Sequence, residues 1–100
     1  MTVMNIVHMR VKPGKDREFL AIQSQGSDAG FSGMRRFSVV KTGERDYCVV
    51  GEWDSMQALA GARPKMIGLL DKTRSLLEDL GGGRGVTEPW SGEVALELEA

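Results

Sequence analysis

The chain lacks several features that would place it in a specialised class of protein. It has one cysteine in 100 residues, which excludes an internal disulfide and gives no sign of an oxidising compartment. It also lacks an excess of basic residues, because 13 Lys and Arg stand against 14 Asp and Glu, for a formal net charge of −1. Binding to nucleic acid is therefore not expected, since neutralising phosphates requires a basic surface.

Long apolar runs and clusters of metal-binding residues are missing from the sequence as well. No stretch approaches the roughly 20 apolar residues that a membrane-spanning helix needs. Met1–Asn5 lacks the charged and long apolar regions of a signal peptide. We therefore expect no membrane association and a cytoplasmic protein. The single histidine, His8, and the single cysteine, Cys48, do not make a metal site.

The overall composition is that of a soluble globular protein. Hydrophobic residues make up 41% of the chain and charged residues 27%. Its length predicts one domain over residues 1–100. A chain this short buries a limited fraction of its surface, so a partner subunit would help to stabilise it.

The most informative stretch is Tyr47–Trp53, which has the composition of a buried strand. Apolar side chains occupy both phases of its alternation: Tyr47, Val49 and Trp53 in one, and Cys48 and Val50 in the other. A strand that is apolar on both sides is usually covered on both faces. A helix start follows directly, with Asp54 as its predicted N-cap and Gln57 as the capping-box partner.

The whole chain is predicted to alternate as β-α-β-β-α-β, with the second helix broken at Pro64. Strands are expected over Val3–Val11, Met34–Lys41, Tyr47–Trp53 and Glu93–Glu99, and helices over Lys15–Gln25, Ser55–Ala62 and Pro64–Leu80. Loops are expected over Gly26–Gly33 and Val86–Gly92, with a hairpin turn at Thr42–Arg45. This order is the ferredoxin-like α+β motif, in which a four-stranded antiparallel sheet carries helices on one face.

The apolar pattern also predicts a homodimer. The strands Val3–Val11 and Tyr47–Trp53 are apolar in both phases, whereas the helices of one chain cover only one face of the sheet. Packing two identical sheets face to face would bury the remaining face. The strand Glu93–Glu99, with its leucines and Val94 in one phase, would reach across and seal the resulting barrel.

Five side chains are candidates for a functional site, each with a plainer alternative. His8 is a candidate base, because imidazole titrates near neutral pH; alternatively it is a strand residue satisfied by a neighbour. Tyr47 and Trp53 share a strand phase and would line an aromatic pocket; alternatively they pack in the core or the dimer. Of Arg35 and Arg36, which point to opposite faces, Arg36 is predicted to bind a carboxylate or phenolate; alternatively both are solvated.

Three segments carry a resemblance to a known family: Val11–Lys15 with Glu18–Phe19, Tyr47–Leu59, and Ser91–Val94. In these segments the chain resembles the antibiotic biosynthesis monooxygenase-like family, within the dimeric α+β barrel group. The resemblance implies a dimer whose sheets close a barrel, with a ligand cavity between sheet and helices or inside the barrel. Some members oxidise aromatic polyketides or quinols with molecular oxygen and no metal or flavin, some degrade haem, and some isomerise small metabolites.

Departures from the family pattern narrow the expected function. The segment Ala58–Lys65 lacks the histidine that members often carry and the tryptophan that haem-degrading members need, so haem degradation is not expected. Asn5 is a candidate for the asparagine that the haem-degrading members carry in their first strand. The sequence leaves open whether Asn5 or His8 faces the cavity. The first hypothesis is a monooxygenase without a cofactor, in which His8 deprotonates an aromatic or quinol-like substrate that Asn5, Arg36, Tyr47 and Trp53 bind. The second is a non-catalytic module that binds a small ligand or a partner.

Overall fold

The structure, a computed structural model, describes residues 2–25 and 31–99. The strands are β1 (Val3–Val11), β2 (Met34–Lys41), β3 (Asp46–Trp53), β4 (Leu77–Glu78) and β5 (Glu88–Glu93). The helices are α1 (Asp16–Gln23) and α2 (Met56–Thr73), followed by a 3₁₀ turn at Arg74–Leu76. The ferredoxin-like α+β fold expected from the sequence is confirmed.

β1 is the centre of the antiparallel sheet that the described residues form. The strand order is β2-β3-β1-β4, and β5 also pairs with β1. β3 covers one edge of β1 along nearly its whole length, while β5 and the two-residue β4 share the other edge. β1 and β3 therefore each have a neighbouring strand along both edges, as the sequence predicted for central strands.

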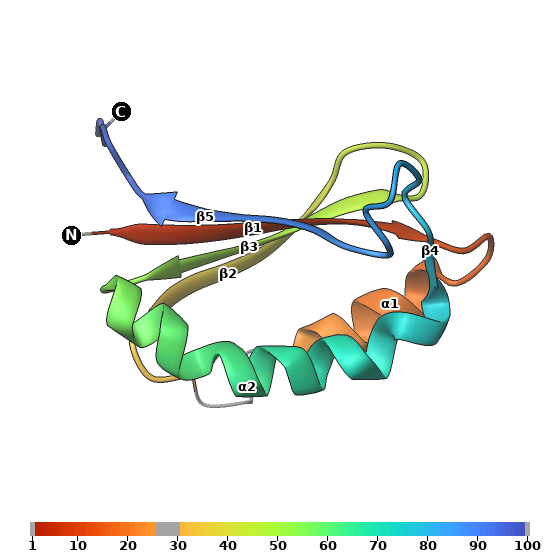
Figure 1. Cartoon of the computed structure of the whole chain (residues 1–100), viewed down its shortest axis with the longest axis horizontal. Coiled ribbons are helices and arrows are strands. Elements are labelled where there is room, and N and C mark those ends of the chain that lie inside the picture. The colour runs from red at the N-terminus through yellow and green to blue at the C-terminus, as the bar shows by residue number, and fades with distance from the viewer. Residues whose placement is uncertain (1, 26–30, 100) are drawn as a thin grey trace.

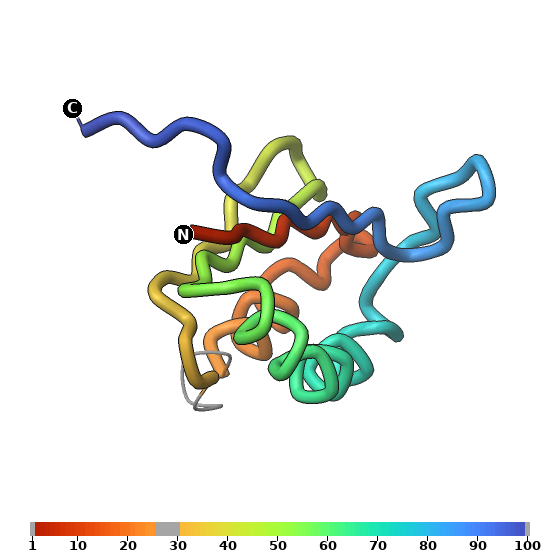
Figure 2. The backbone as a smooth tube through the Cα atoms, turned by 60° about the vertical axis from the view of Figure 1, so that its left-hand side comes forward, coloured from red at the N-terminus to blue at the C-terminus, as the bar shows by residue number. Residues whose placement is uncertain are grey.

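Both helices lie on the same face of the sheet, as Figures 1 and 2 show from two directions. One buried cluster packs α1 against the sheet, where the rings of Phe19 and Tyr47 lie 5.2 Å apart. A second cluster packs the first half of α2 around Trp53 and Leu59, each 1% exposed. The other face of the sheet has no helix over it in the described part of the chain.

The predicted break at Pro64 is wrong, because α2 runs through this residue. Pro64 and Ala60, whose carbonyl loses its intrahelical donor, are both exposed, so water can satisfy that carbonyl. The buried positions Leu59, Ala62 and Thr73 continue the same apolar face on both sides of the proline. Burial of that face therefore outweighs the local cost of proline, and the helix bows rather than breaks (Figure 1).

The predicted end of this helix at Leu80 is also wrong, since α2 stops at Thr73. The hydroxyl of Thr73 donates to the carbonyl of Leu70, which competes with continued helix formation. Leu77 then enters β4 and pairs with Val11, and it remains buried at 3% exposure. No helix in the described part of the chain is long and apolar enough to cross a membrane.

The last strand lies earlier in the chain than predicted. β5 covers Glu88–Glu93, which lies mostly in the segment expected to be a loop, whereas residues 94–99 form no strand. The backbone N–H of Val94 still donates to the carbonyl of Thr2, at the point where β1 begins. Beyond it, residues 95–99 pair with no strand in the described part of the chain, and this segment stands away from the body in Figure 2.

The connections agree with the expectations in place and differ in detail. The hairpin turn between β2 and β3 lies where it was predicted. Ser55, rather than Asp54, caps α2, because its hydroxyl accepts the N–H of Ala58 at 3.0 Å. Asp54 instead forms an ion pair with Arg35. Most of the predicted loop Gly26–Gly33 lies outside the described residues, which resume at residue 31.

Candidate functional site

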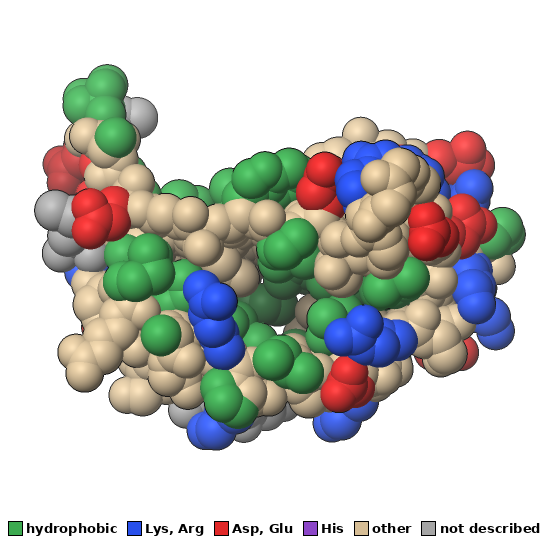
Figure 3. All heavy atoms as spheres, in the orientation of Figure 1, with side chains coloured by type: hydrophobic (Ala, Val, Ile, Leu, Met, Phe, Trp, Pro, Cys, Tyr) green, Lys and Arg blue, Asp and Glu red, His purple; other side chains and the backbone are tan. Residues whose placement is uncertain are grey.

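A cavity of about 350 Å³ lies between the sheet and the helices. Its floor is the helix-facing side of β1, β2 and β3, and its walls come from α2, the end of α1 and β5. The lining is mostly apolar and includes Val7, Met34, Phe37, Met66 and Leu70. Figure 3 shows the hollow between the two layers, with hydrophobic side chains inside it and basic side chains at its rim.

Two predicted residues, Asn5 and Trp53, meet in this cavity. Nε1 of Trp53 donates to Oδ1 of Asn5 at 2.7 Å. An indole nitrogen can only donate, so this bond fixes the amide of Asn5 with its oxygen toward Trp53. The amide nitrogen of Asn5 is left to donate elsewhere, and no described residue accepts from it. The strand register thus answers the open question of phase: Asn5 faces the cavity of its own chain.

Gly51 makes room for this pair. It lies opposite Asn5 in the β1–β3 register and is buried. A Cβ atom at this position would come within 2.5 Å of Oδ1 of Asn5 and 2.8 Å of Nε1 of Trp53. Any side chain at Gly51 would therefore push the two polar groups apart, which makes this glycine part of the site.

Arg63 and Gln23 are polar residues of the cavity that sequence reasoning missed. Arg63 is an exposed residue of α2 that lines the cavity, and it takes part in no ion pair with a described residue. Gln23 is the last residue of α1 and is 3% exposed. Gln23 follows Phe19 by four residues, so both lie on one face of the helix. This spacing was the signal in the sequence from which the burial of Gln23 could have been predicted.

Tyr47, predicted to bind substrate, lies in the core beside α1 and does not line the cavity. Its hydroxyl donates to Oδ2 of Asp16 at 2.5 Å. This bond, together with burial and the negative charge of Asp16, raises the pKa of Tyr47 to about 12. Of its two interpretations, core packing describes the position of Tyr47.

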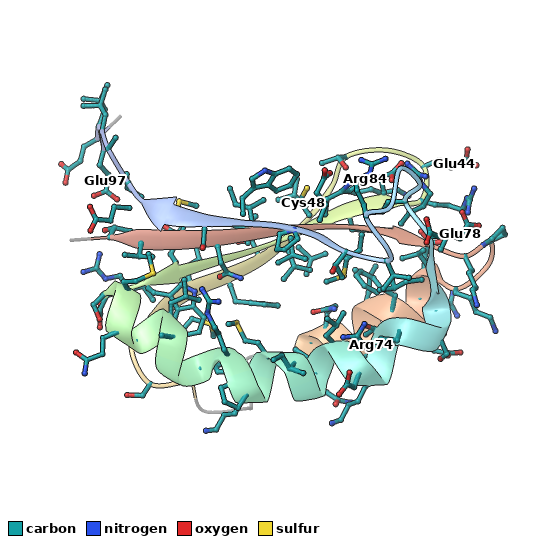
Figure 4. The ribbon with its side chains drawn as sticks, viewed as in Figure 1. Glu44, Cys48, Arg74, Glu78, Arg84 and Glu97 are labelled. Carbon is teal, nitrogen blue, oxygen red and sulfur yellow. The ribbon has the colours of Figure 1, made fainter. Side chains whose placement is uncertain are left out.

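His8, the candidate base, lies on the sheet face opposite the cavity. Its Nε2 is 3.0 Å from Oδ1 of Asp46 and its Nδ1 is 3.7 Å from Oε1 of Glu88. The hydrogen bond from His8, with a second from Arg10, holds the pKa of the Asp46 carboxyl below its usual value. Cys48, the neighbour of His8 across the β1–β3 pair, is on the same face (Figure 4). A catalytic role for His8 stays a prediction, without contact to this cavity.

The two arginines of β2 also lie outside the cavity. The side chain of Arg36 is 75% exposed and reaches Oε2 of Glu52 at 3.6 Å. Arg35 forms an ion pair with Asp54 and donates to the hydroxyl of Thr2 at 2.7 Å. Both are in contact with solvent, and substrate binding by Arg36 stays a prediction.

The cavity therefore offers hydrogen bonds and one positive charge rather than a base. The described residues that line it include no Asp, Glu or His. Asn5 supplies a donor, Gln23 a donor and an acceptor, and Arg63 a cation. Within residues 2–25 and 31–99, no group of three or more His, Cys, Asp or Glu side chains is arranged to hold a metal ion.

Comparison with protein families gives one match. The model of the family described as "Antibiotic biosynthesis monooxygenase" matches residues 2–63, more than half of the chain. The matched segment contains Asn5, Gly51, Trp53 and Arg63, and it ends within α2. Comparison with curated protein sequences gave no match.

Solved structures share the fold along nearly the whole chain. SnoaB, a cofactor-independent oxygenase from Streptomyces nogalater, superposes with a TM-score of 0.77 at 15% identity, covering 99% of this chain and 98% of that one. Rv0793 from Mycobacterium tuberculosis superposes with a TM-score of 0.77 at 13% identity, covering 99% of this chain and 100% of that one. A conserved protein from Methanosarcina mazei Go1 superposes with a TM-score of 0.76 at 15% identity, covering 93% of this chain and 92% of that one. At these identities the likeness shows the fold alone.

Proposed function

Because the chain belongs to the antibiotic biosynthesis monooxygenase family, we propose that it is a small monooxygenase acting on an aromatic or quinol-like metabolite without a metal or flavin. The observation that carries the proposal is the apolar cavity with the Asn5–Trp53 pair on its floor. A flat ring system would pack between the sheet and α2, with few polar groups to orient it. The description of SnoaB as a cofactor-independent oxygenase supports the absence of a cofactor.

The polar groups of the cavity suit a substrate that reacts as its anion. The free N–H of Asn5 would donate to the oxygen on which negative charge develops, and Arg63 would attract that charge from the rim. The anion then gives electrons to molecular oxygen. In an anthrone-type substrate the reacting CH₂ becomes a carbonyl; one oxygen atom of O₂ enters that carbonyl, and the other leaves as water with the two hydrogens.

Loss of the substrate proton does not require a base inside the cavity. The described lining residues include no carboxylate or imidazole, so the proton would pass to solvent at the open rim. Stabilising the anion by Asn5 and Arg63 lowers the free energy of this step. The competing hypothesis is that His8 takes the proton, and oxygen uptake by His8→Ala distinguishes the two.

We further propose that the protein acts as a homodimer. Two rows of side chains cross the uncovered face of the sheet: Ser38, Val50, Ile6 and Trp90 in one, and Val40, Cys48, His8 and Glu88 in the other. Trp90 is 53% exposed and Val40 46%. Pairing this face with its copy would remove a large apolar surface from water, as an isologous interface does.

The alternative is a non-catalytic protein that binds a small molecule in the same cavity. The observation that favours it is the lack of an acid or base among the described lining residues. A binding protein needs the apolar walls and the Asn5 donor but no proton transfer.

Oxygen uptake with a panel of hydroquinones and anthrones distinguishes the two functions. The monooxygenase predicts uptake above the buffer rate, retained in His8→Ala and reduced in Asn5→Ala. Uptake that is lost in His8→Ala, with the fold and ligand binding intact, would assign the base to His8. Clear binding of these compounds without uptake in any case would establish the binding protein instead.

A further inference from the structure

Gln23 is a polar side chain enclosed at the edge of an apolar cavity. It is 3% exposed and shares the buried face of α1 with Phe19, one turn earlier. It lines the cavity and also borders a second hollow, beside Met34, Phe37 and Val39 of β2. Gln23 therefore enters the cavity from the helix layer, on the side of β2.

The amide of Gln23 has no hydrogen-bond partner among the described residues. Every fully enclosed side-chain nitrogen or oxygen of those residues does have a partner, so the Gln23 amide must keep contact with the hollows that it lines. An amide supplies both donors and an acceptor. An apolar ligand that fills the cavity would leave this amide unpaired, which is unfavourable, whereas a ligand oxygen that bonds to it avoids that penalty.

Asn5 and Gln23 mark two separate polar positions in the cavity. Asn5 lies on β1, two strands away from β2, beside which Gln23 enters. Because neighbouring strands lie about 4.8 Å apart, the two positions are on the order of 10 Å apart across the sheet. The side chains that line the cavity between them are mostly apolar. This spacing fits a fused-ring molecule with an oxygen at each end.

We propose that Gln23 is a specificity-determining residue that hydrogen-bonds a carbonyl or hydroxyl oxygen at the end of the ligand remote from Asn5. The proposed role of Gln23 rests on one part of the proposed function, that the cavity binds a flat small molecule. It concerns which ligand is bound and not the reaction. A ligand without the remote oxygen leaves the amide unpaired. A site built to pair a buried polar group discriminates against such a ligand.

The test uses two hydroxyanthraquinones as probes, one with a hydroxyl at both ends of the ring system and one with a hydroxyl at one end only. Binding is measured by calorimetry or by quenching of tryptophan fluorescence. The parent protein should bind the two-ended probe about 10- to 100-fold more tightly than the one-ended probe. In Gln23→Leu this ratio should fall to about one, mainly through weaker binding of the two-ended probe. Gln57→Leu, the same change at an exposed position of α2 away from the cavity, should keep the parent ratio.

Thermal melting of the ligand-free variants separates ligand recognition from a structural role. Gln23→Leu should melt at or above the parent temperature, because an apolar group of similar size replaces an unpaired amide. An unchanged probe ratio in Gln23→Leu would overturn the role of Gln23 while leaving the proposed function intact. A lower melting temperature would show that the amide is structural and also overturn it. If the parent binds neither probe, the proposed function fails and the role of Gln23 fails with it.

Discussion

Trp53 and Asn5, 48 residues apart in the chain, are joined by an indole hydrogen bond of 2.7 Å across the β1–β3 pair. Since the bond occupies the oxygen of the Asn5 amide, its two N–H groups remain to serve a ligand. The relationship makes Trp53 a positioning residue for Asn5. It also gives the cavity a donor whose direction is fixed before any ligand enters.

Replacing Asn5 should affect the reaction more than the binding of an apolar ligand. We expect Asn5→Ala to lower kcat by about 10²-fold, the usual effect of losing one donor to a developing oxyanion. Ser91→Ala is the matched control, because Ser91 also lines the cavity and lies next to Asn5 in the β1–β5 register. Steady-state oxygen uptake would check this. Equal effects of the two changes would refute a special role for Asn5.

Adding a methyl group to Gly51 should disturb the site, whereas the same change at Gly68 should not. The new Cβ at Gly51 meets both members of the polar pair, so Gly51→Ala should destabilise the fold by about 1–3 kcal/mol and weaken ligand binding. At Gly68, in α2, a Cβ meets nothing within 4 Å, and Ala should stabilise the helix by about 0.5–1 kcal/mol. Urea unfolding of both variants measures the difference in stability. An unchanged free energy of unfolding in Gly51→Ala would contradict the predicted clash with Asn5 and Trp53.

Tyr47 should titrate at unusually high pH, and it is the only tyrosine in the sequence, so its absorbance is unambiguous. The bond to Asp16, burial and the charge of that carboxylate raise its pKa to about 12 in the folded protein. The raised pKa gives a contribution to stability that is complete below about pH 10, the pKa of free tyrosine, and is lost as the pH rises toward 12. Tyrosinate absorbance should therefore appear above pH 11 in the parent and earlier in Asp16→Asn. A midpoint near 10 in the folded parent would disprove the buried pair.

The segment after β5 should matter for assembly rather than for the fold of one chain. Leu96 and Leu98 are 75% and 82% exposed, and the segment stands away from the body, as the position of Glu97 shows in Figure 4. If a partner subunit covers these leucines, each contributes about 1.5–3 kcal/mol, so Leu96→Ser with Leu98→Ser should weaken the dimer strongly. Light scattering should report twice the chain mass for the parent.

Matched substitutions of Glu97 and Glu99 by serine should leave that mass unchanged, because these carboxylates are exposed beside the leucines. A folded parent that stays monomeric at high concentration would contradict the dimer and the role of this segment together.

Two leucines near the end of α2 should differ in their effect on stability. Leu77 is 3% exposed and belongs to the core, so Leu77→Ala should cost about 2–5 kcal/mol. Leu70 is partly buried and borders the cavity, where truncation removes fewer contacts, so Leu70→Ala should cost less. Chemical denaturation of the two variants gives both values. Equal costs would show that the cavity wall is packed as tightly as the core.

The order of elements was predictable because it depends on local patterns. Two-sided apolar strands identified the centre of the sheet, and Ser, Gly and Pro marked the connections. The errors arose where contacts distant in sequence decide the outcome. Pro64 stays helical because the buried face of α2 continues past it, and Leu77 leaves the helix to pair with Val11. The last strand was predicted too late in the chain, because pairing with β1, and not the alternation of its own residues, decides which residues form it.

The candidate site was predictable only in part, for the same reason. Alternation placed Tyr47 and Trp53 in one phase, and both do point toward the helices. Asp16 and Phe19, in the first half of α1, nevertheless contact Tyr47, whereas Trp53 remains at the cavity. Which phase of β1 faces inward was decided by pairing, and this separated Asn5 from His8. Gln23 and Arg63 were missed because their roles depend on where α1 and α2 lie over the sheet.

The position of β1 between β3 and β5 has a consequence for synthesis on the ribosome. β1 emerges first and can pair with β3 once residues 46–53 appear, but its other edge stays open until residues 88–93 follow. At about 5–20 residues per second, that edge waits for several seconds. An open edge on a largely apolar strand is a site for pairing with other chains. The nascent protein is therefore most prone to aggregate between completion of α2 and arrival of β5, and the same late strand supplies the last wall of the cavity.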